Sequence, residues 1–285
     1  MPDKTTLDPK WGQPDGTHDP RVLAHFQALE SDVLITTAPK AGTTWMQQIL
    51  YQMRSGGNTD FDNIDSVVPW LELPRRDKSW RQVLDDYDTL PRPRLFKTHC
   101  TAEQTPGIGT ARIILTVRDP RDCCVSFYHH LINMTDSARD MTGHQRPASF
   151  AAHVETWLKF AAWFRNVKSW WPYRDHEKVL LFRYEDLKRD PGAGVDRIAA
   201  FLNWVVTPEH KAKVLKYSSF DWMKAHDNKF SGQTESGDST FKPGRFIRQG
   251  KVGAYRDLIT PVLEKKILDR AHAELEPECL RFLEI

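Results

Sequence analysis

One segment constrains the fold of this chain more than any other: a buried strand that leads through a tight turn directly into a helix. Residues 32–37 are mostly apolar or β-branched, which predicts a strand. The pattern breaks at Pro39 and Gly42, and from Thr43 to Met53 apolar residues recur near helical spacing. A strand, a Gly-containing turn and a helix in this order direct backbone N–H groups at one point, which predicts an anion-binding turn.

Strands and helices alternate along the rest of the chain. Further strands are predicted at 94–98, 112–117 and 178–183, and helices at 21–30, 120–134, 153–171, 193–203, 208–216, 219–225 and 261–274. Such alternation is typical of βαβ units, so we expect one α/β domain over residues 1–285 with a mostly parallel sheet flanked by helices. We expect residues 1–20 to form a loose arm and residues 225–255 to form a lid.

Composition and charge exclude several classes of function. A formal net charge of +2 over 285 residues is too small for bulk binding to nucleic acid or to a membrane surface. The sequence shows no apolar leader segment and no apolar run of about 20 residues, so we expect a cytoplasmic protein. None of the four cysteines has metal-site spacing, and we expect reduced thiols and no bound metal.

The turn itself carries the groups that a transferred anion needs. Its sequence is Pro39-Lys40-Ala41-Gly42-Thr43-Thr44-Trp45. The lysine precedes the glycine, unlike in the nucleotide loop GxxxxGK[ST]. A sulfuryl group carries less negative charge than a phosphoryl group, so one lysine beside the leaving phosphate suits its transfer without a magnesium ion. The heptapeptide resembles the 5′-phosphosulfate loop of the cytosolic-type sulfotransferases, which use 3′-phosphoadenosine 5′-phosphosulfate (PAPS).

A second anion-binding segment follows the strand at 112–117. Arg118 ends this strand, and Ser126 lies about two turns into the next helix. An arginine fork at a strand end and a serine on the following helix can converge on one phosphate. The segment resembles the 3′-phosphate segment of the same family, with Arg118 and Ser126 in matching places.

The resemblance implies further contacts with the PAPS nucleotide. They are expected from Ser218, Phe220, Tyr184, Phe246, Arg248, Gln249 and Gly250. Tyr184 is expected near the adenine, with Trp45 and Phe220 stacked on either side of it. The family often has lysine in the place of Gln249, and Lys251 is a candidate substitute.

Lys97 and His99 form the candidate catalytic pair with Lys40. Side chains alternate along a strand, so Lys97 and His99 point to the same side. A histidine can take a proton from an acceptor hydroxyl, and the lysine can steady negative charge. The triplet Lys97-Thr98-His99 resembles the catalytic triplet of the family. His129 and His130 are rival candidates, which we interpret as packing or pocket-lining residues.

The resemblance implies the reaction: in-line transfer of a sulfuryl group from PAPS to a hydroxyl, or an amine, of a small aromatic or apolar acceptor. Candidate walls of the acceptor site are Trp70, Trp80, Phe127 and Phe230. Two alternatives remain open, a P-loop kinase for small molecules and a nucleotide-binding protein without activity. The oligomeric state is open as well, because the dimer motif of the family is degraded around Thr260 and Pro261.

Overall fold

A four-stranded sheet forms the centre of the computed structural model, which describes residues 7–75, 77–232 and 239–285. The strands are β1 (Val33–Ile35), β2 (Leu95–Lys97), β3 (Arg112–Val117) and β4 (Val179–Arg183). Their order is β2-β1-β3-β4, and every pairing between them is parallel. The α/β class and the mostly parallel sheet are thus confirmed.

The register of the sheet brings three strand ends together. Ile35 at the end of β1 lies opposite Lys97 on β2 and Ile114 on β3. Because parallel strands point the same way, the turn after β1, the residues after Lys97 and the residues after β3 share one edge of the sheet. This edge is where α/β proteins bind their ligands.

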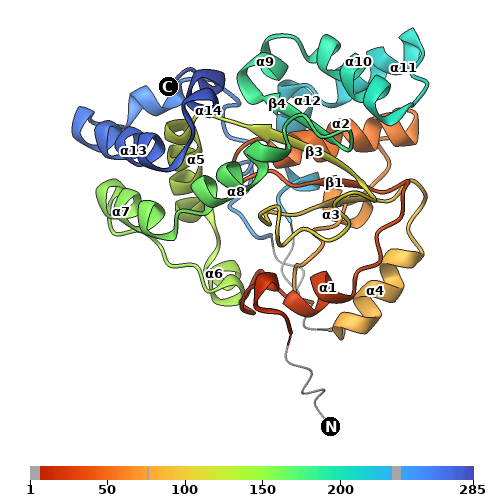
Figure 1. Cartoon of the computed structure of the whole chain (residues 1–285), viewed down its shortest axis with the longest axis horizontal. Helices are drawn as coiled ribbons and strands as arrows, with labels where there is room; N and C mark the ends of the chain where they lie inside the picture. The colour runs from red at the N-terminus through yellow and green to blue at the C-terminus, as the bar shows by residue number, and fades with distance from the viewer. Residues whose placement is uncertain (1–6, 76, 233–238) are drawn as a thin grey trace.

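The strands bury both of their faces, as expected for a parallel sheet. Leu34 packs into one hydrophobic core, whereas its neighbours Val33 and Ile35 pack into another on the opposite face. The first core is covered by α1 (Pro20–His25), α4 (Trp80–Asp88), α5 (Pro120–Asn133), α7 (Phe150–Phe160), α8 (Ala162–Trp170), α13 (Pro261–Glu274) and α14 (Pro277–Leu283). The second is covered by α2 (Thr43–Ser55), α3 (Ile64–Val67), α9 (Tyr184–Arg189), α10 (Pro191–Leu202), α11 (Pro208–Tyr217) and α12 (Phe220–Ala225). In Figure 1, α5, α7 and α13 lie to the left of the sheet and α9 to α11 at its upper right.

The helix predicted at 153–171 is wrong as one element. The chain turns at Ala161, which has a φ of 52° and separates α7 from α8. The indole of Trp163 donates to the Arg118 carbonyl (3.1 Å), and the Asn166 amide donates to the carbonyls of Thr36 (3.0 Å) and Cys100 (2.9 Å). These bonds fix α8 at the strand ends. The break at Ala161 lets α8 run in a direction different from that of α7.

Several helices have no counterpart in the sequence prediction. They are α3, α4, α6 (Asp136–Thr142), α9 and α14. Four of these have seven residues or fewer, which is too short for a helical period to emerge. The predicted helix at 261–274 is confirmed by α13. Among the described residues, no helix combines the length and the apolar character needed to cross a bilayer.

The expected arm and lid both pack against the body of the protein where the structure describes them. At the N-terminal end, the Asp19 amide donates to the Glu72 carbonyl (2.8 Å) and the short helix η1 (Pro9–Trp11) precedes α1. This bond anchors the end of the 1–20 segment at Asp19, and residues 1–6 lie outside the described residues, so the loose arm stays a prediction. In the 225–255 segment the regular elements are η3 (Asp227–Lys229) and the start of η4 (Ala254–Asp257). Residues 233–238 of the expected lid lie outside the described residues.

Candidate active site

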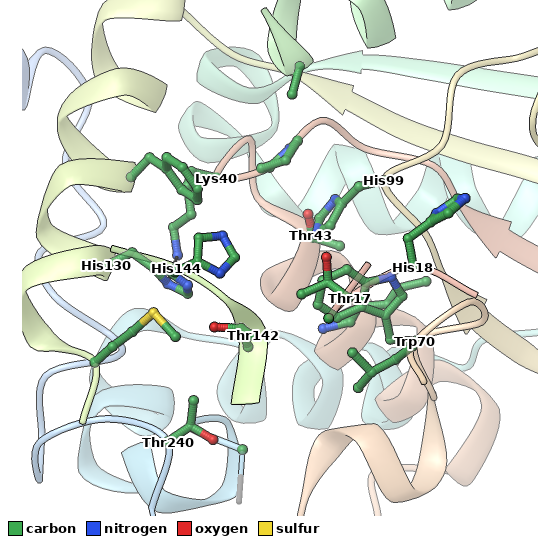
Figure 2. A pocket seen from close by; sticks show the side chains of 18 of the residues that line it. Thr17, His18, Lys40, Thr43, Trp70, His99, His130, Thr142, His144 and Thr240 are labelled. Atoms are coloured by element: carbon green, nitrogen blue, oxygen red, sulfur yellow. Dashed lines mark hydrogen bonds between the residues drawn. The ribbon is translucent and has the colours of Figure 1, made fainter. Parts of the chain in front are cut away.

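A cavity of about 1590 Å³ opens at the carboxyl edge of the sheet. Its lining includes most of the predicted site residues: Lys40, Gly42, Thr43, Thr44, Trp45, Lys97, His99, Arg118, Tyr184 and Phe246. Figure 2 shows Lys40 and His130 on one side of it and His99 with Trp70 on the other. A small second cavity adjoins it and is lined by Lys40, His130 and Phe246 together with Ser126 and Arg248.

The turn after β1 is shaped by two residues with positive φ. Lys40 has a φ of 68° and Gly42 a φ of 104°. A Cβ atom on Gly42 would lie 2.9 Å from the Tyr184 ring, so both the backbone angle and the close approach require glycine. The Thr116 hydroxyl donates to the carbonyl of buried Ala41 (2.6 Å), which ties the turn to β3.

The turn leaves hydrogen-bond donors free for an anion. Gly42 is the N-cap of α2 and gives the helix no side-chain cap, so the first N–H groups of α2 have no partner within the helix. The Thr43 hydroxyl is buried and, within the described residues, has no hydrogen-bond partner. Free N–H groups, a helix N-terminus and an unpaired buried hydroxyl suit a phosphate or sulfate group.

Positive charge is concentrated around the turn. The Lys40 ammonium donates to Nδ1 of His130 (3.1 Å) and lies 5.1 Å from the centre of the Phe246 ring. Burial, followed by the charges of Lys97 and Arg118, lowers the pKa of Lys40 to about 8. Among residues 7–75, 77–232 and 239–285, the cationic form of Lys40 forms no ion pair, and an anionic ligand would supply its counter-charge.

Arg118 links the end of β3 to the C-terminal segment. Its guanidinium stacks 4.5 Å from the Tyr184 ring centre and donates to the carbonyls of Lys40 (3.4 Å) and Lys251 (3.0 Å). It also pairs with Asp122 at 3.3 Å, and Asp122 accepts from the Gly253 amide at 2.8 Å. The Nε of Arg118 is buried and has no partner in the part of the chain that the structure describes. Arg118 is thus held firmly while keeping one donor free.

The small cavity brings Ser126 and Arg248 together. Burial and the charge of Arg118 lower the pKa of Arg248. In the described ranges Arg248 forms no ion pair. The carboxylates that act on it are Asp257 and Asp122, and Asp122 is already engaged with Arg118 and the Gly253 amide. Arg248 and Ser126 in the small cavity, with the charge of Arg118 acting on Arg248, are groups that suit a second phosphate. The role of Ser126 toward a phosphate stays a prediction.

Aromatic side chains lie beside the turn. The Trp45 indole donates to the Ser218 carbonyl (2.9 Å), and its ring meets the Tyr184 ring edge-on at 5.6 Å. The Ser218 hydroxyl is itself engaged with the Val214 carbonyl (2.7 Å). The Lys188 ammonium lies 5.8 Å from the ring centres of both Trp45 and Phe220, so these two rings approach one common point.

The predicted contacts at 249–251 differ from one another in their environment. A Cβ atom on Gly250, whose φ is 56°, would lie 2.6 Å from the Phe220 ring. Gln249 is exposed, and so is the side chain of Lys251, whose carbonyl is its link to Arg118. Lys251 lines neither of the two cavities, and its role as a substitute for the missing lysine stays a prediction. The sequence analysis did not name Lys188 as a site residue, although it lies one helical turn after Tyr184.

His99 is held in one tautomer. Its Nδ1 lies 2.7 Å from the carbonyl of Thr37, and because a carbonyl only accepts, Nδ1 carries the proton. Nε2 is then left with a lone pair. Burial, followed by the charge of Lys97, lowers the pKa of His99 to about 4, so the ring is neutral near pH 7. A neutral imidazole with a free Nε2 is ready to accept a proton.

Lys97 and His99 both lie against Trp70, as strand alternation predicts. The Lys97 ammonium is 4.7 Å from the Trp70 ring centre and 3.3 Å from Asp65, and the His99 ring meets Trp70 edge-on at 5.0 Å. The Lys97 amide donates to Pro69 and its carbonyl accepts from Leu71, so Trp70 lies beside β2 like a fifth strand segment.

The two neighbours of His99 in the chain, Thr98 and Cys100, are held by groups that the sequence analysis missed. The Thr98 hydroxyl donates to the buried Glu72 carboxylate (3.0 Å), and the Cys100 carbonyl accepts from Asn166 and from Trp170 (3.2 Å). Cys100 is a free, buried thiol. The sequence offered one signal for these contacts, namely the polar Asn166 between the apolar residues Phe164 and Val167 of α8.

The remainder of the large cavity has mixed walls. Trp70, Phe127 and Phe230 line it as predicted. Trp80 does not, because its ring packs 4.4 Å from the His25 ring on α1, outside the cavity lining. His130 lines both cavities, whereas His129 lines the small one alone. Further wall residues that the sequence analysis missed are Thr17, His18, Met134, Thr142, His144, Thr240 and Phe241.

An anion-binding turn and a neutral histidine in one cavity at the edge of a parallel sheet define a P-loop-like group-transfer enzyme. Comparison with known proteins narrows this class. The sulfotransferase domain model matches residues 30–276, and the chain belongs to the sulfotransferase family. It is therefore a sulfotransferase, with the PAPS-dependent activity typical of that family.

Individual sulfotransferases are similar in sequence to most of this chain. Mouse sulfotransferase 1B1 is 31% identical over 252 residues, covering 84% of this chain and 80% of its own. Human sulfotransferase 2A1 is 31% identical over 251 residues, covering 84% and 82%. Among solved structures, mouse sulfotransferase SULT7A1 complexed with PAP has a TM-score of 0.71 at 24% identity and covers 91% of this chain and 89% of its own. At 24% identity, this similarity supports the assignment of the fold of the present chain. The family match overturns the kinase alternative.

Proposed function

We propose that the chain transfers the sulfuryl group of PAPS to a hydroxyl, or an amine, of a small aromatic or apolar acceptor, with His99 as the general base. The observation that carries this proposal is the tautomer of His99. Its Nδ1–H is committed to the Thr37 carbonyl, so the free Nε2 is the atom that accepts the proton of the acceptor.

The residues around the turn fit PAPS. The free donors at the start of α2, the unpaired Thr43 hydroxyl and Lys40 would hold the 5′-phosphosulfate. Arg118, Ser126 and Arg248 would hold the 3′-phosphate, and Trp45, Tyr184 and Phe220 would surround the adenine. PAPS supplies the sulfuryl group and leaves as 3′-phosphoadenosine 5′-phosphate (PAP). The remaining predicted contacts, Ala41, Thr44, Ser218, Phe246, Gln249 and Gly250, are proposed through their backbone or packing.

The side chains of this protein divide the chemical work. The bond between sulfur and the 5′-phosphate oxygen breaks as the acceptor oxygen bonds to sulfur, and the acceptor proton passes to Nε2 of His99. Lys40 stabilises the oxygen of the leaving phosphate, and Lys97 stabilises the transferring group. Because the mixed wall includes the aromatic side chains of Trp70, Phe127 and Phe230, an aromatic or apolar acceptor fits it best. One structure of the same fold, with a TM-score of 0.72 and 19% identity, is retinol dehydratase in complex with the small molecule androsterone and PAP.

Radiolabelled sulfate transfer tests the proposal. The purified protein is incubated with labelled PAPS and separate pools of phenols, aliphatic alcohols and amines. We expect product with the phenol or alcohol pool and stronger thermal stabilisation by PAP than by ATP with magnesium. Tight PAP binding without transfer to any pool would instead favour the remaining alternative, a nucleotide-binding protein without activity.

A further inference from the structure

The hydrogen bond between Lys40 and His130 joins the turn after β1 to the last part of α5. Lys40 Nζ lies 3.1 Å from His130 Nδ1, across 90 residues of sequence. Both side chains line the large cavity and the small one, so the pair stands where the two cavities meet. Figure 2 shows the lysine side chain extended towards His130 and away from His99.

The bond fixes the protonation of His130. An ammonium group can only donate, so Nδ1 of His130 accepts and the ring proton is on Nε2. His99 has the opposite tautomer. Burial, followed by the charge of Lys40, also holds the pKa of His130 well below its usual value, so the ring stays neutral.

The groups that face this pair are mostly basic. His130 faces Lys40, His144, Lys97 and His99. Lys40 faces Lys97 on β2, Arg118 after β3, the thiol of Cys123 on α5 and Arg248 in the C-terminal segment. A carboxylate facing Lys40 would cancel the charge that the leaving phosphate needs. A neutral imidazole orients the ammonium without cancelling its charge, and leaves two of its three N–H groups free.

Aromatic residues hold the His130 ring in place. Phe127 stacks on it with ring centres 5.8 Å apart and planes 15° apart, and Phe241 lies 4.6 Å away. Phe246 lies 6.3 Å from the ring and also contacts Lys40. These rings fix the direction of Nδ1, and none of them can accept a conventional hydrogen bond in its place.

We propose that His130 is a positioning residue for Lys40: its Nδ1 directs the Lys40 ammonium at the boundary of the two cavities, where the leaving phosphate forms. This proposal rests on the role of Lys40 in the proposed function. It predicts two separate effects of losing the acceptor atom. The ammonium loses a hydrogen bond that favours its charged form, and the enzyme loses the orientation of Lys40 during transfer.

Two substitutions separate the acceptor atom from the ring. His130→Phe keeps an aromatic ring among Phe127, Phe241 and Phe246 but removes the acceptor, whereas His130→Asn offers a carbonyl oxygen in a smaller side chain. His272→Leu, at an exposed position on α13, is the matched control. The first readout is the pH dependence of Lys40 acetylation by acetic anhydride in protein without nucleotide, followed by peptide mass spectrometry.

We expect the apparent pKa of Lys40 to fall by about 1 in His130→Phe, to recover partly in His130→Asn and to stay unchanged in His272→Leu. In transfer assays, we expect kcat to fall about tenfold in His130→Phe, with PAP affinity within about threefold and partial recovery in His130→Asn. The same pKa of Lys40 in all variants, or a kcat no better in His130→Asn than in His130→Phe, would overturn the proposal.

The two readouts also separate this proposal from the proposed function. If the natural sequence transfers no sulfate, the proposed function fails while the acetylation result still decides whether His130 holds Lys40. If His130→Phe does not fold, His130→Leu and His130→Asn carry the acetylation test. An unchanged pKa of Lys40 in both folded variants then overturns the proposal.

Discussion

The two ends of the large cavity are built in different ways. At the PAPS end, the groups come from short segments at strand ends, namely the turn at 39–45 and Arg118, and backbone geometry fixes them. At the acceptor end, the wall combines residues of the N-terminal segment, the 70–78 region, α5 and the 225–255 segment. The groups of the first end are set mainly by the turn after β1 and the parallel strand ends, whereas the wall of the second is assembled from loops and helices. Substitutions at one end should therefore leave the other largely unaffected.

The largest effect at the PAPS end is expected for Lys40→Ala. It removes the charge that stabilises the leaving phosphate, so kcat should fall about 10²- to 10³-fold, and PAP affinity should fall as well. Steady-state kinetics and calorimetric titration with PAP measure the two effects. Equal kcat in Lys40→Ala and the natural protein would remove Lys40 from the mechanism.

Arg118→Ala should chiefly weaken binding of the nucleotide. Loss of hydrogen bonds to a charged phosphate is worth about 1.5–3 kcal/mol, or roughly 10- to 100-fold in the Kd of PAP. Arg118→Lys is the control that keeps the charge but loses the guanidinium fork, and it should recover only part of the affinity. A normal PAP affinity in Arg118→Ala would contradict the assignment of the 3′-phosphate site.

The pH profile should show whether the anion binds beside both His99 and Lys40. In the free enzyme His99 must be neutral and Lys40 charged, so kcat/KM should fall below about pH 4 and above about pH 8. Bound PAPS is an anion and raises both pKa values, so both limbs of the kcat profile should lie at higher pH. Limbs at the same pH in both profiles would show that the anion does not bind beside these groups.

The smallest effect is expected at the acceptor wall. Trp70→Ala should raise the KM for the acceptor about 3- to 10-fold through lost aromatic contact, with PAP affinity unchanged. Trp80→Ala is the matched control, since Trp80 packs against His25 outside the cavity. A similar rise in KM for both variants would show that general destabilisation, and not the wall, is responsible.

The same contrast explains what the sequence could predict. Gly42, Arg118 and His99 follow strands, and the parallel register of those strands places them at one edge, so a local pattern was enough. Trp70 and Trp80 both lie in the stretch for which the sequence predicted no helix or strand, and tertiary packing decides which one faces the cavity. His130, Glu72 and Asn166 act through hydrogen bonds to residues 26 to 130 positions away, which no local pattern reveals.

The break of the predicted 153–171 helix has the same origin. An apolar face at helical spacing runs through Trp157, Phe164 and Trp171, so the sequence favours one helix. The hydrogen bonds from Trp163 and Asn166 to strand-end carbonyls override this local preference. Buried backbone carbonyls must find donors, and α8 supplies them.

The central claim is that Nε2 of His99 takes the proton of the acceptor while the PAPS end works independently. The most direct test measures His99→Ala twice on the same sample: the single-turnover rate of labelled sulfate transfer with saturating PAPS, and the Kd of PAP by calorimetry. We predict a loss of rate of about 10²- to 10⁴-fold, with the Kd of PAP changed by less than about threefold. A transfer rate equal to that of the natural protein would contradict the account.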